Sequence, residues 1–575
     1  MHTAKSRSHQ RFQACCIDPA RAVNPAQLEW DTYCCFRVRP AHSMQLDPAA
    51  LTLWLDALKQ QPVETAITSL DDALEQFADA GLPAAQLAAL LERLRLALPG
   101  QIARLAKAWY ADRPLPLAPP ERAMLTAMQA LFGKLSDLYW LCCQQFEREP
   151  ESEMRNQNLA APLQRCVHAL VSRMIEDYRA RQVIAPGVWL ELHRVIDKAN
   201  ALGVDKISIP DELNPNSVSA INVTYGRIVL LASAQAGAMT PRNLDATLAL
   251  TGLLEPFIEC TWQAGDAAAE SRVHATGRMR VLHAAGATHL LNNTRLNGAL
   301  LACSQKLAAG EAVASLDVLP ISRPELGGLL VRLHKVWCGI GEIRGEARAR
   351  ADEPAQVASG LYAIYRLASG ADFAEPREFH VYAAGARPGA EGAARRSELA
   401  GTGEAAQWRV LDRSGEGLRA SRSIEGGRLS RACLMGFRIE TARPKEGSTV
   451  QRAAARQVDF SLGEVRWVQE DAAGYAPAIS AGIKLLPGQV FTAVMRGHGG
   501  RDGSLYQEVA PAFLLEQAAA PKLIVPNGWW KPDRVVDVWR NGIITRMRMT
   551  ELLIRGTDFE AGRFTVEKPE KAAAR

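Results

Sequence analysis

Two short segments carry residue types that could hold a charged ligand. One reads Arg344-Gly345-Glu346-Ala347-Arg348, an Arg-x-x-x-Arg pair, and the other contains Asp412-x-Ser414-x-x-Gly417. Arginine presents a planar fork of N–H donors that fits phosphate oxygens and the O6/N7 edge of guanine, and it stacks on base faces. Lysine would supply the charge without this fork. Two arginines four residues apart can therefore grip one ligand from two directions.

The second segment suits the other half of the same chemistry. Asp412 can accept hydrogen bonds from the N1–H and N2–H groups of guanine, and Ser414 can bond a phosphate or cap a turn. Gly417 leaves room for backbone amides to approach a ligand, or for a positive φ. Taken singly, these motifs also fit a solvated linker and a hairpin turn. Their combination and order favour ligand binding.

Two further landmarks follow, Gly463-Glu-Val465-Arg-Trp467 and Gly482-Ile483-Lys-Leu485. In this order, the four motifs resemble those of the PilZ family, whose members bind cyclic di-GMP. The resemblance covers roughly residues 340–487. It implies a small antiparallel β-barrel that binds cyclic di-GMP through Arg344, Arg348, Asp412, Ser414 and Gly417. It also implies a receptor, not an enzyme, that acts in the control of motility, pili or exopolysaccharide.

The interval between Arg348 and Asp412 is longer than is usual in the family. A short amphipathic helix and an Ala/Gly-rich segment, 383–407, would have to be inserted into the barrel, which costs little free energy. The interval also leaves a second arginine cluster open. Arg387, Arg395 and Arg396 lie closer to Asp412, although none of them forms Arg-x-x-x-Arg.

The 575-residue chain is too long for one hydrophobic core, so we expect an α+β multidomain protein. Leucines at helical spacing, such as Leu87, Leu90, Leu91, Leu94 and Leu98, predict a mainly α-helical N-terminal region. Apolar spacing predicts a helix over 244–260, and alternation predicts separate strands over 457–460 and 464–469. The predicted parts are an extension (1–48), a helical domain (49–262), a small mixed α/β module (263–338), a PilZ-like barrel (339–487) with an inserted loop (361–407), a β-rich C-terminal module (488–567) and a tail (568–575).

Composition excludes several classes of protein. A net charge of +5 is too small a surplus to favour a nucleic-acid partner, and no run of about 18 apolar residues predicts a membrane span. The N-terminus lacks the apolar stretch of a secretory signal, so we expect a cytoplasmic protein. Eleven cysteines include no C-x-x-C pair. A zinc site from Cys15, Cys16, Cys34 and Cys35 has the wrong spacing, so we predict no metal and no cofactor.

The favoured interpretation is a cyclic di-GMP effector that relays the ligand's level to an unknown protein partner through its helical region. Ligand would draw a hinge at 339–352 onto the barrel and fix the angle between the two parts. The alternative is a PilZ-like scaffold that binds no ligand. A third interpretation, nucleic-acid binding by the arginine-rich segment 387–438, is less favoured. The sequence contains no G-x-S-x-G elbow, Walker loop or H-x-x-x-H pair, which argues against an enzyme.

Overall fold

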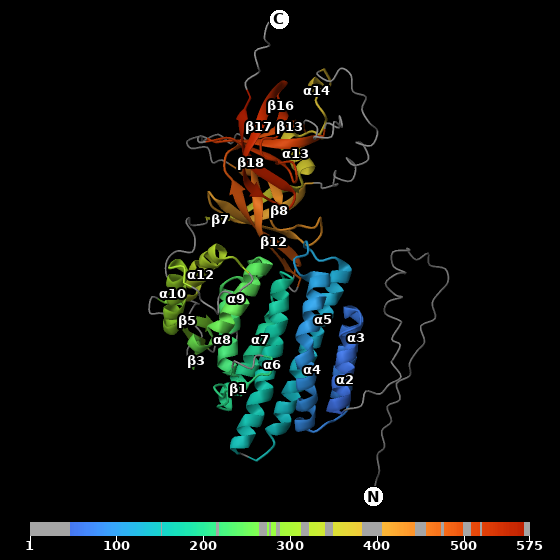
Figure 1. The fold of residues 1–575 in the computed structure, drawn as a ribbon, viewed down its shortest axis with the longest axis vertical. Coiled ribbons are helices and arrows are strands. Elements are labelled where there is room, and N and C mark those ends of the chain that lie inside the picture. The colour runs from blue at the N-terminus through green and yellow to red at the C-terminus, as the bar shows by residue number, and fades with distance from the viewer. Residues whose placement is uncertain are drawn as a thin grey trace, which may run out of the picture.

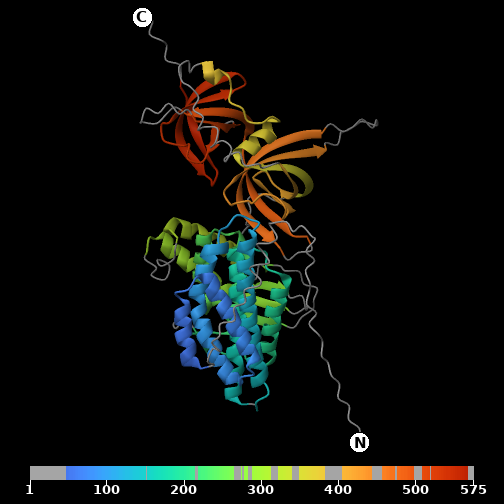
Figure 2. The same cartoon turned by 90° about the vertical axis from the view of Figure 1, so that its right-hand side faces the viewer.

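The computed structural model describes residues 47–150, 152–213, 218–263, 273–274, 278–282, 288–311, 321–339, 349–381, 405–442, 456–472, 476–497, 508–517 and 520–567. A helical part occupies one end of the molecule, and two β-barrels follow one another along its long axis (Figures 1 and 2). The chain is therefore an α+β multidomain protein, as predicted. Among the helices in these ranges, none combines the length and the apolar character needed to cross a membrane.

The helical part is built around long helices that bury leucine stripes. The predicted stripe from Leu87 to Leu98 lies on α4, where these leucines are at most 2% exposed. Prolines occupy the first turns of α2, α5, α7 and α9, where a missing N–H costs nothing. The helices are α2 (Pro48–Leu58), α3 (Val63–Asp79), α4 (Ala84–Leu105), η1 (Ala106–Tyr110), α5 (Pro119–Phe146), α6 (Glu153–Arg179), α7 (Pro186–Ala201), α8 (Ile221–Ser233), η2 (Ala236–Ala238), α9 (Pro241–Leu253) and η3 (Glu255–Phe257). A two-stranded pair, β1 (Ile209–Pro210) and β2 (Val218–Ser219), lies between α7 and α8.

A four-stranded antiparallel sheet and two helices follow. The sheet has the order β3-β6-β5-β4, and the helices α10 and α12 come after it in the chain. Trp337 of α12 is fully buried, and its indole N–H donates to the Leu230 carbonyl of α8 at 2.8 Å, which ties this module to the helical part. The elements are β3 (Glu259–Gln263), β4 (Val273–His274), β5 (Arg278–Leu282), β6 (Thr288–Asn292), α10 (Thr294–Ala308) and α12 (Arg323–Cys338).

The next six strands close into a barrel, here called barrel 1. Its strand order around the ring is β10-β11-β12-β9-β8-β7. Alternate residues such as Val410, Leu418 and Phe437 fill its interior. The strands are β7 (Ala349–Ser359), β8 (Ala406–Arg413), β9 (Gly417–Ser423), β10 (Leu434–Ala442), β11 (Arg456–Asp471) and β12 (Ala478–Leu486). Two helices, α13 (Leu361–Ser369) and α14 (Glu378–Val381), lie in the chain between β7 and β8.

The C-terminal β-rich part is a second closed barrel, barrel 2, with the order β13-β14-β15-β18-β17-β16. Counted from its own first strand, each barrel has the same ring order, 1-2-3-6-5-4. Helix α13 packs between the barrels, where Ile364 joins Leu434 of barrel 1 and Phe513 of barrel 2 in one buried cluster. The strands are β13 (Gln489–Gly497), β14 (Val509–Glu516), β15 (Lys522–Pro526), β16 (Val535–Arg540), β17 (Ile543–Arg555) and β18 (Phe559–Val566).

Within the described ranges, no group of three or more His, Cys, Asp or Glu side chains is arranged to hold a metal. The four N-terminal cysteines considered in the sequence analysis lie outside those ranges.

A buried carboxyl near the end of α6 gives the stability of the helical part a pH dependence. Tyr110 donates to Glu176 at 3.1 Å, and the Arg179 Nε lies 3.2 Å from the other carboxylate oxygen. Burial nevertheless dominates and raises the pKa of Glu176 from 4.5 to about 7. The folded protein therefore retains a proton that the unfolded chain releases between these two pH values.

This group's contribution to stability is fully present below about pH 4.5 and is lost as the pH rises through about 7. We expect its contribution to fall by up to about 1.4 kcal/mol per pH unit within that window. Denaturant unfolding of the wild-type protein and of Glu176→Gln at pH 5, 6 and 7 tests this. Because glutamine resembles the protonated carboxyl and does not titrate, the wild-type protein should become progressively less stable relative to the variant as the pH rises, and parallel curves would contradict the assignment.

Candidate functional site

The Asp/Ser/Gly motif forms the hairpin between β8 and β9. The Ser414 N–H donates to the Gly417 carbonyl at 2.8 Å, and the Ser414 hydroxyl lies 3.3 Å from the same oxygen. Ser414 therefore caps the turn, which is one of the two roles expected for it. Gly417 begins β9, and its φ is not positive. Of the two roles considered for this glycine, only the close approach of a ligand to the backbone amides remains.

Strand pairing places five residues from five strands in one line across barrel 1. Asp412 of β8 lies opposite Arg419 of β9 on one side and opposite Arg350 of β7 on the other. Arg419 lies opposite Gly482 of β12, which in turn lies opposite Trp467 of β11. Directly opposed residues have Cβ atoms about 5 Å apart, so the five positions are continuous. We call this line the barrel row.

The barrel row lies on the outer surface. Leu418 and Ala420, on either side of Arg419 along β9, are 1% and 0% exposed and fill the interior. Because side chains alternate along a strand, Arg419 points outward, and its side chain is about half exposed. Its Nε lies 2.8 Å from Asp412 Oδ2, so the centre of the row is an arginine–aspartate ion pair.

Trp467 covers Gly482 at one end of the row. A Cβ built on Gly482 would lie 2.0 Å from the Trp467 Nε1 and 2.3 Å from its Cε2, which no side chain can tolerate. Gly482 is therefore required so that the indole can lie across the strand. The row thus offers an aromatic ring and charged groups of both signs on one surface. These are the groups that purine bases and phosphates require.

The structure places none of the arginines that were predicted to bind the ligand. Arg344, Arg348, Arg387, Arg395 and Arg396 lie outside the described residues. The described part of β7 begins at Ala349, the residue after Arg348, and Ala349 lies opposite Arg413 in the hairpin strand. The long interval after Arg348 therefore separates two strands that are neighbours in the barrel.

Sequence reasoning missed Arg350 and Arg419 as members of this surface. Arg419 is two residues beyond Gly417, where strand alternation alone predicts an outward side chain. Arg350 could be found only from the pairing of β7 with β8.

Barrel 1 is joined to the helical part near the C-terminal ends of β9 and β11. Glu470 of β11 is fully buried, and its carboxylate accepts from the Leu117 N–H at 3.1 Å and from Arg122. Its backbone also pairs with the segment after α6, donating to the Arg181 carbonyl at 3.0 Å and accepting from the Val183 N–H at 2.8 Å.

The loop between β9 and β10, residues 424–433, supplies the rest of this junction. Leu429 pairs with Leu115 through two backbone hydrogen bonds, and Arg431 donates to the Met239 carbonyl at 2.6 Å. Buried Arg422 holds the loop from inside by donating to the Glu425 and Gly427 carbonyls. The Ala432 carbonyl also accepts from the Thr557 N–H of barrel 2, so one loop contacts all three parts of the molecule.

A family model matches the helical part of the chain. Residues 49–264 match a family model described as the N-terminal domain of the cyclic-di-GMP receptor FimW. A protein of Pseudomonas aeruginosa, "Cyclic-di-GMP receptor FimW", is 27% identical over 214 residues. That alignment covers 36% of this chain and 34% of the relative, so the match spans about a third of the relative's length. No solved structure matches the chain. Neither description names the PilZ family, and the PilZ resemblance of barrel 1 stays a prediction.

Proposed function

We propose that this protein is a receptor for cyclic di-GMP and that the ligand binds on the barrel row of a PilZ-like barrel 1. The observation that carries the proposal is the alignment of Arg350, Asp412, Arg419, Gly482 and Trp467 on one outer surface. The match of the helical part to a model described as a cyclic-di-GMP receptor supports the same ligand from a separate region of the chain.

The chemistry of the row fits the parts of the ligand. Arg419 is half exposed beside Asp412, so its guanidinium can give donors to the O6/N7 edge of a guanine. Trp467, which is only partly buried, can stack on a base. Arg344 and Arg348 precede the strand that pairs with the hairpin, and we assign to them the two phosphates. Arg387, Arg395 and Arg396 are the alternative donors.

The ligand's effect would pass through the junction with the helical part. Strand β11 runs from Trp467 to Glu470 in three residues, and β9 runs from Arg419 to Arg422, which organises loop 424–433. A ligand that moves the outer surface of these strands therefore acts on the contacts that position the helical part. We expect this junction to set which surface of the helical part a protein partner meets. Of the hinge expected at 339–352, residues 349–352 belong instead to strand β7 of the barrel, and residues 340–348 lie outside the described ranges.

In this proposal the protein is a cytoplasmic signalling receptor and not an enzyme. Its helical part contacts the unknown protein partner, and the resemblance to PilZ proteins suggests motility, pili or exopolysaccharide as the process. Barrel 2 shares the ring order of barrel 1, but its hairpin between the second and third strands reads Gln517-Ala-Ala-Ala-Pro521. It lacks the Asp/Ser/Gly motif, so we assign one ligand site to each chain.

Isothermal titration with cyclic di-GMP tests the proposal, with GTP and cyclic di-AMP as controls. We expect selective binding that Arg419→Gln weakens about tenfold or more, because a charge-assisted hydrogen bond contributes about 1.5–3 kcal/mol. Arg409→Gln is the matched control. Arg409 is an exposed arginine of β8 in barrel 1, and its ion-pair partner Asp352, at 3.0 Å, is not a member of the row.

Three outcomes are distinguishable. Selective binding that is lost in Arg419→Gln but kept in Arg409→Gln supports both the ligand and the site. Binding that Arg419→Gln leaves unchanged would keep the receptor but remove the row as its site. No binding of cyclic di-GMP at high concentration would favour the ligand-free scaffold.

A further inference from the structure

Barrel 2 lacks the ligand motif, but it contacts the loop that joins barrel 1 to the helical part. Residues 556–558 connect β17 to β18 and are here called the hairpin tip. The Thr557 N–H of the tip donates to the Ala432 carbonyl of loop 424–433 at 2.9 Å, and the Thr557 hydroxyl donates to the Arg431 carbonyl at 3.3 Å. The tip therefore binds the end of the loop that leads into β10.

A glycine and an aspartate complete the contact. The φ of Gly556 is not positive, yet a Cβ there would lie 2.4 Å from the Ala432 carbonyl oxygen and 2.4 Å from the Phe559 ring, so the close approach of the loop requires a glycine. Asp558 Oδ1 accepts from the Leu434 N–H at 2.9 Å. The tip thus fits the backbone of the loop on both sides of Thr557.

Ala432 has an unusual backbone conformation. Its φ is +55°, in the left-handed region that residues with a Cβ rarely adopt. Its N–H donates to the Val465 carbonyl of barrel 1 at 2.7 Å, while its carbonyl accepts from barrel 2, so hydrogen bonds from both barrels hold it there. Strained residues of this kind persist only where their surroundings fix them, and they are common in switch regions. Loss of the contact with barrel 2 would allow Ala432 to relax.

The residues that precede Ala432 in the loop bind the helical part. Arg431 donates to the Met239 carbonyl at 2.6 Å, and the Leu115 N–H donates to the Leu429 carbonyl at 2.9 Å. A change in the backbone at Ala432 would move both loop residues relative to barrel 1. The conformation of this one residue therefore links barrel 2 to the helical part.

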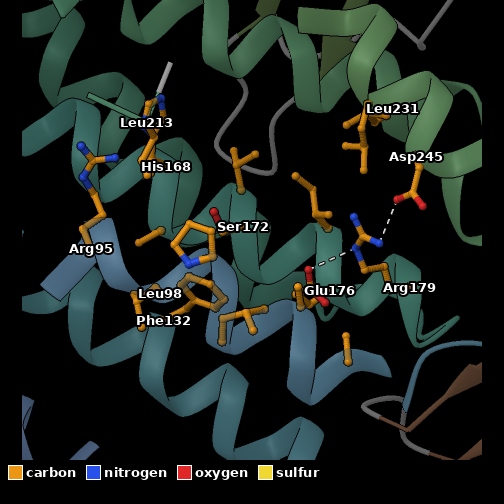
Figure 3. Close-up of a pocket in the computed structure, with 18 of the residues that line it drawn as sticks. Arg95, Leu98, Phe132, His168, Ser172, Glu176, Arg179, Leu213, Leu231 and Asp245 are labelled. Atoms are coloured by element: carbon orange, nitrogen blue, oxygen red, sulfur yellow. Dashed lines mark ion pairs between the residues drawn. The ribbon is translucent and has the colours of Figure 1, made fainter. Parts of the chain in front are cut away.

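The helical side of the contact is fixed. Met239 is buried and lies just before α9. Arg179 of α6 pairs with Asp245 of α9 at 2.8 Å and with Glu176 of its own helix at 3.2 Å, and Figure 3 shows both ion pairs. Because α6 and α9 are joined in this way, opening the contact would move the loop and not the helices that it binds.

The two barrels stay together without the tip. A buried apolar cluster around α13 joins them and includes Ile364, Leu434 and Phe513. Thr557 and Asp558 contribute hydrogen bonds, which are individually weak, and Thr557 is exposed to water. The tip can therefore leave the loop while the barrels remain in contact.

We propose that the hairpin tip is a latch by which barrel 2 controls the attachment of the helical part. While the latch is closed, Ala432 stays left-handed, and Arg431 and Leu429 bind the helical part. When the latch opens, Ala432 relaxes and these two contacts are lost, whereas the contact through Glu470 remains. The latch gives barrel 2 a function and does not require a ligand on the barrel row.

Hydrogen exchange of the full chain, measured without ligand, tests the latch. Asp558→Ala removes the acceptor of the Leu434 N–H, so the Leu115 amide should exchange about fivefold faster or more. The Val183 amide, which donates to Glu470, should change less than about twofold. Asp558→Asn is the matched control, because its side-chain oxygen can accept the same hydrogen bond, and it should not speed exchange at Leu115. Unchanged exchange at Leu115 in folded Asp558→Ala, or equal acceleration at Leu115 and Val183, would overturn the proposal.

A second pair of variants leaves barrel 2 unchanged. Ala432→Gly removes the strain at positive φ, because glycine adopts this region readily, and should slow exchange at Leu115 about threefold. Ser430→Gly is the control, since Ser430 lies in the same loop without a positive φ, and this change should not slow exchange. Faster exchange in Ala432→Gly than in the wild-type protein would show that the closed latch stores no strain at Ala432 and would refute the proposal.

Discussion

Replacing Glu470 by alanine should weaken the junction between barrel 1 and the helical part by about 3 kcal/mol. The Glu470 carboxylate is 0% exposed and accepts from the Leu117 N–H, Arg122 and Gln182. Alanine would leave these donors facing a buried void. Each unsatisfied buried donor costs about 1–3 kcal/mol. The charge of Arg122 adds less, because its side chain is a third exposed and water screens it.

Hydrogen exchange measures this loss locally, which matters because a chain of several domains does not unfold in one step. We expect faster exchange at Leu117 and Val183, whose amides donate to Glu470, with little change at Leu418 inside barrel 1. Glu464→Ala is the control. Glu464 is a buried carboxylate on the same strand, but it pairs locally with Arg466 at 2.9 Å. Equal effects of the two variants on Leu117 would show that Glu470 does not hold the junction.

The sequence predicted helices and strands well where the spacing of apolar side chains within one segment decides the structure of that segment. The leucine stripe of α4 required only helical spacing, and the alternating segments after residue 405 required only the two-residue period of a strand. The hairpin with Asp412, Ser414 and Gly417 was predictable for the same local reason. All three residues lie within one turn and its flanking strands.

Two elements were predicted wrongly because a local signal was misinterpreted. Strand β11 is one continuous strand, Arg456–Asp471, and not two. Gly463 lies inside this strand, where Ile483 fills the space and a Cβ would lie 2.3 Å from the Ile483 Cγ2. The helix expected over 244–260 ends at Leu253, because Pro256 cannot continue the hydrogen-bond ladder.

The barrel row itself was beyond sequence reasoning. Its five residues come from five strands that span positions 350–482, and the pattern within each strand says nothing about register between strands. A shift of one residue in any pair would send a member of the row into the interior. The motif residues marked the right hairpin, but the neighbours that complete its surface appear only once the barrel is closed.

Replacing Gly482 by alanine should damage the proposed ligand site without touching any charged group. The new Cβ would occupy the space of the Trp467 ring, 2.0 Å from its Nε1, so the indole must leave its place across the strand. Overpacking of this kind costs typically about 1–3 kcal/mol of stability. If Trp467 stacks on a guanine, its displacement should weaken cyclic di-GMP about ten- to hundredfold, since base stacking contributes about 1–3 kcal/mol.

Titration of Gly482→Ala and Trp467→Leu with cyclic di-GMP separates the two effects. Both variants should lose affinity by similar factors, because both remove the ring from the row, while only Gly482→Ala strains the barrel. Ser480→Ala is the control, since Ser480 is two residues away on the same side of β12. Full affinity in a folded Trp467→Leu protein would show that the ring only covers Gly482. The ligand's contacts would then have to come from Arg350, Arg419 and the Arg-x-x-x-Arg pair alone.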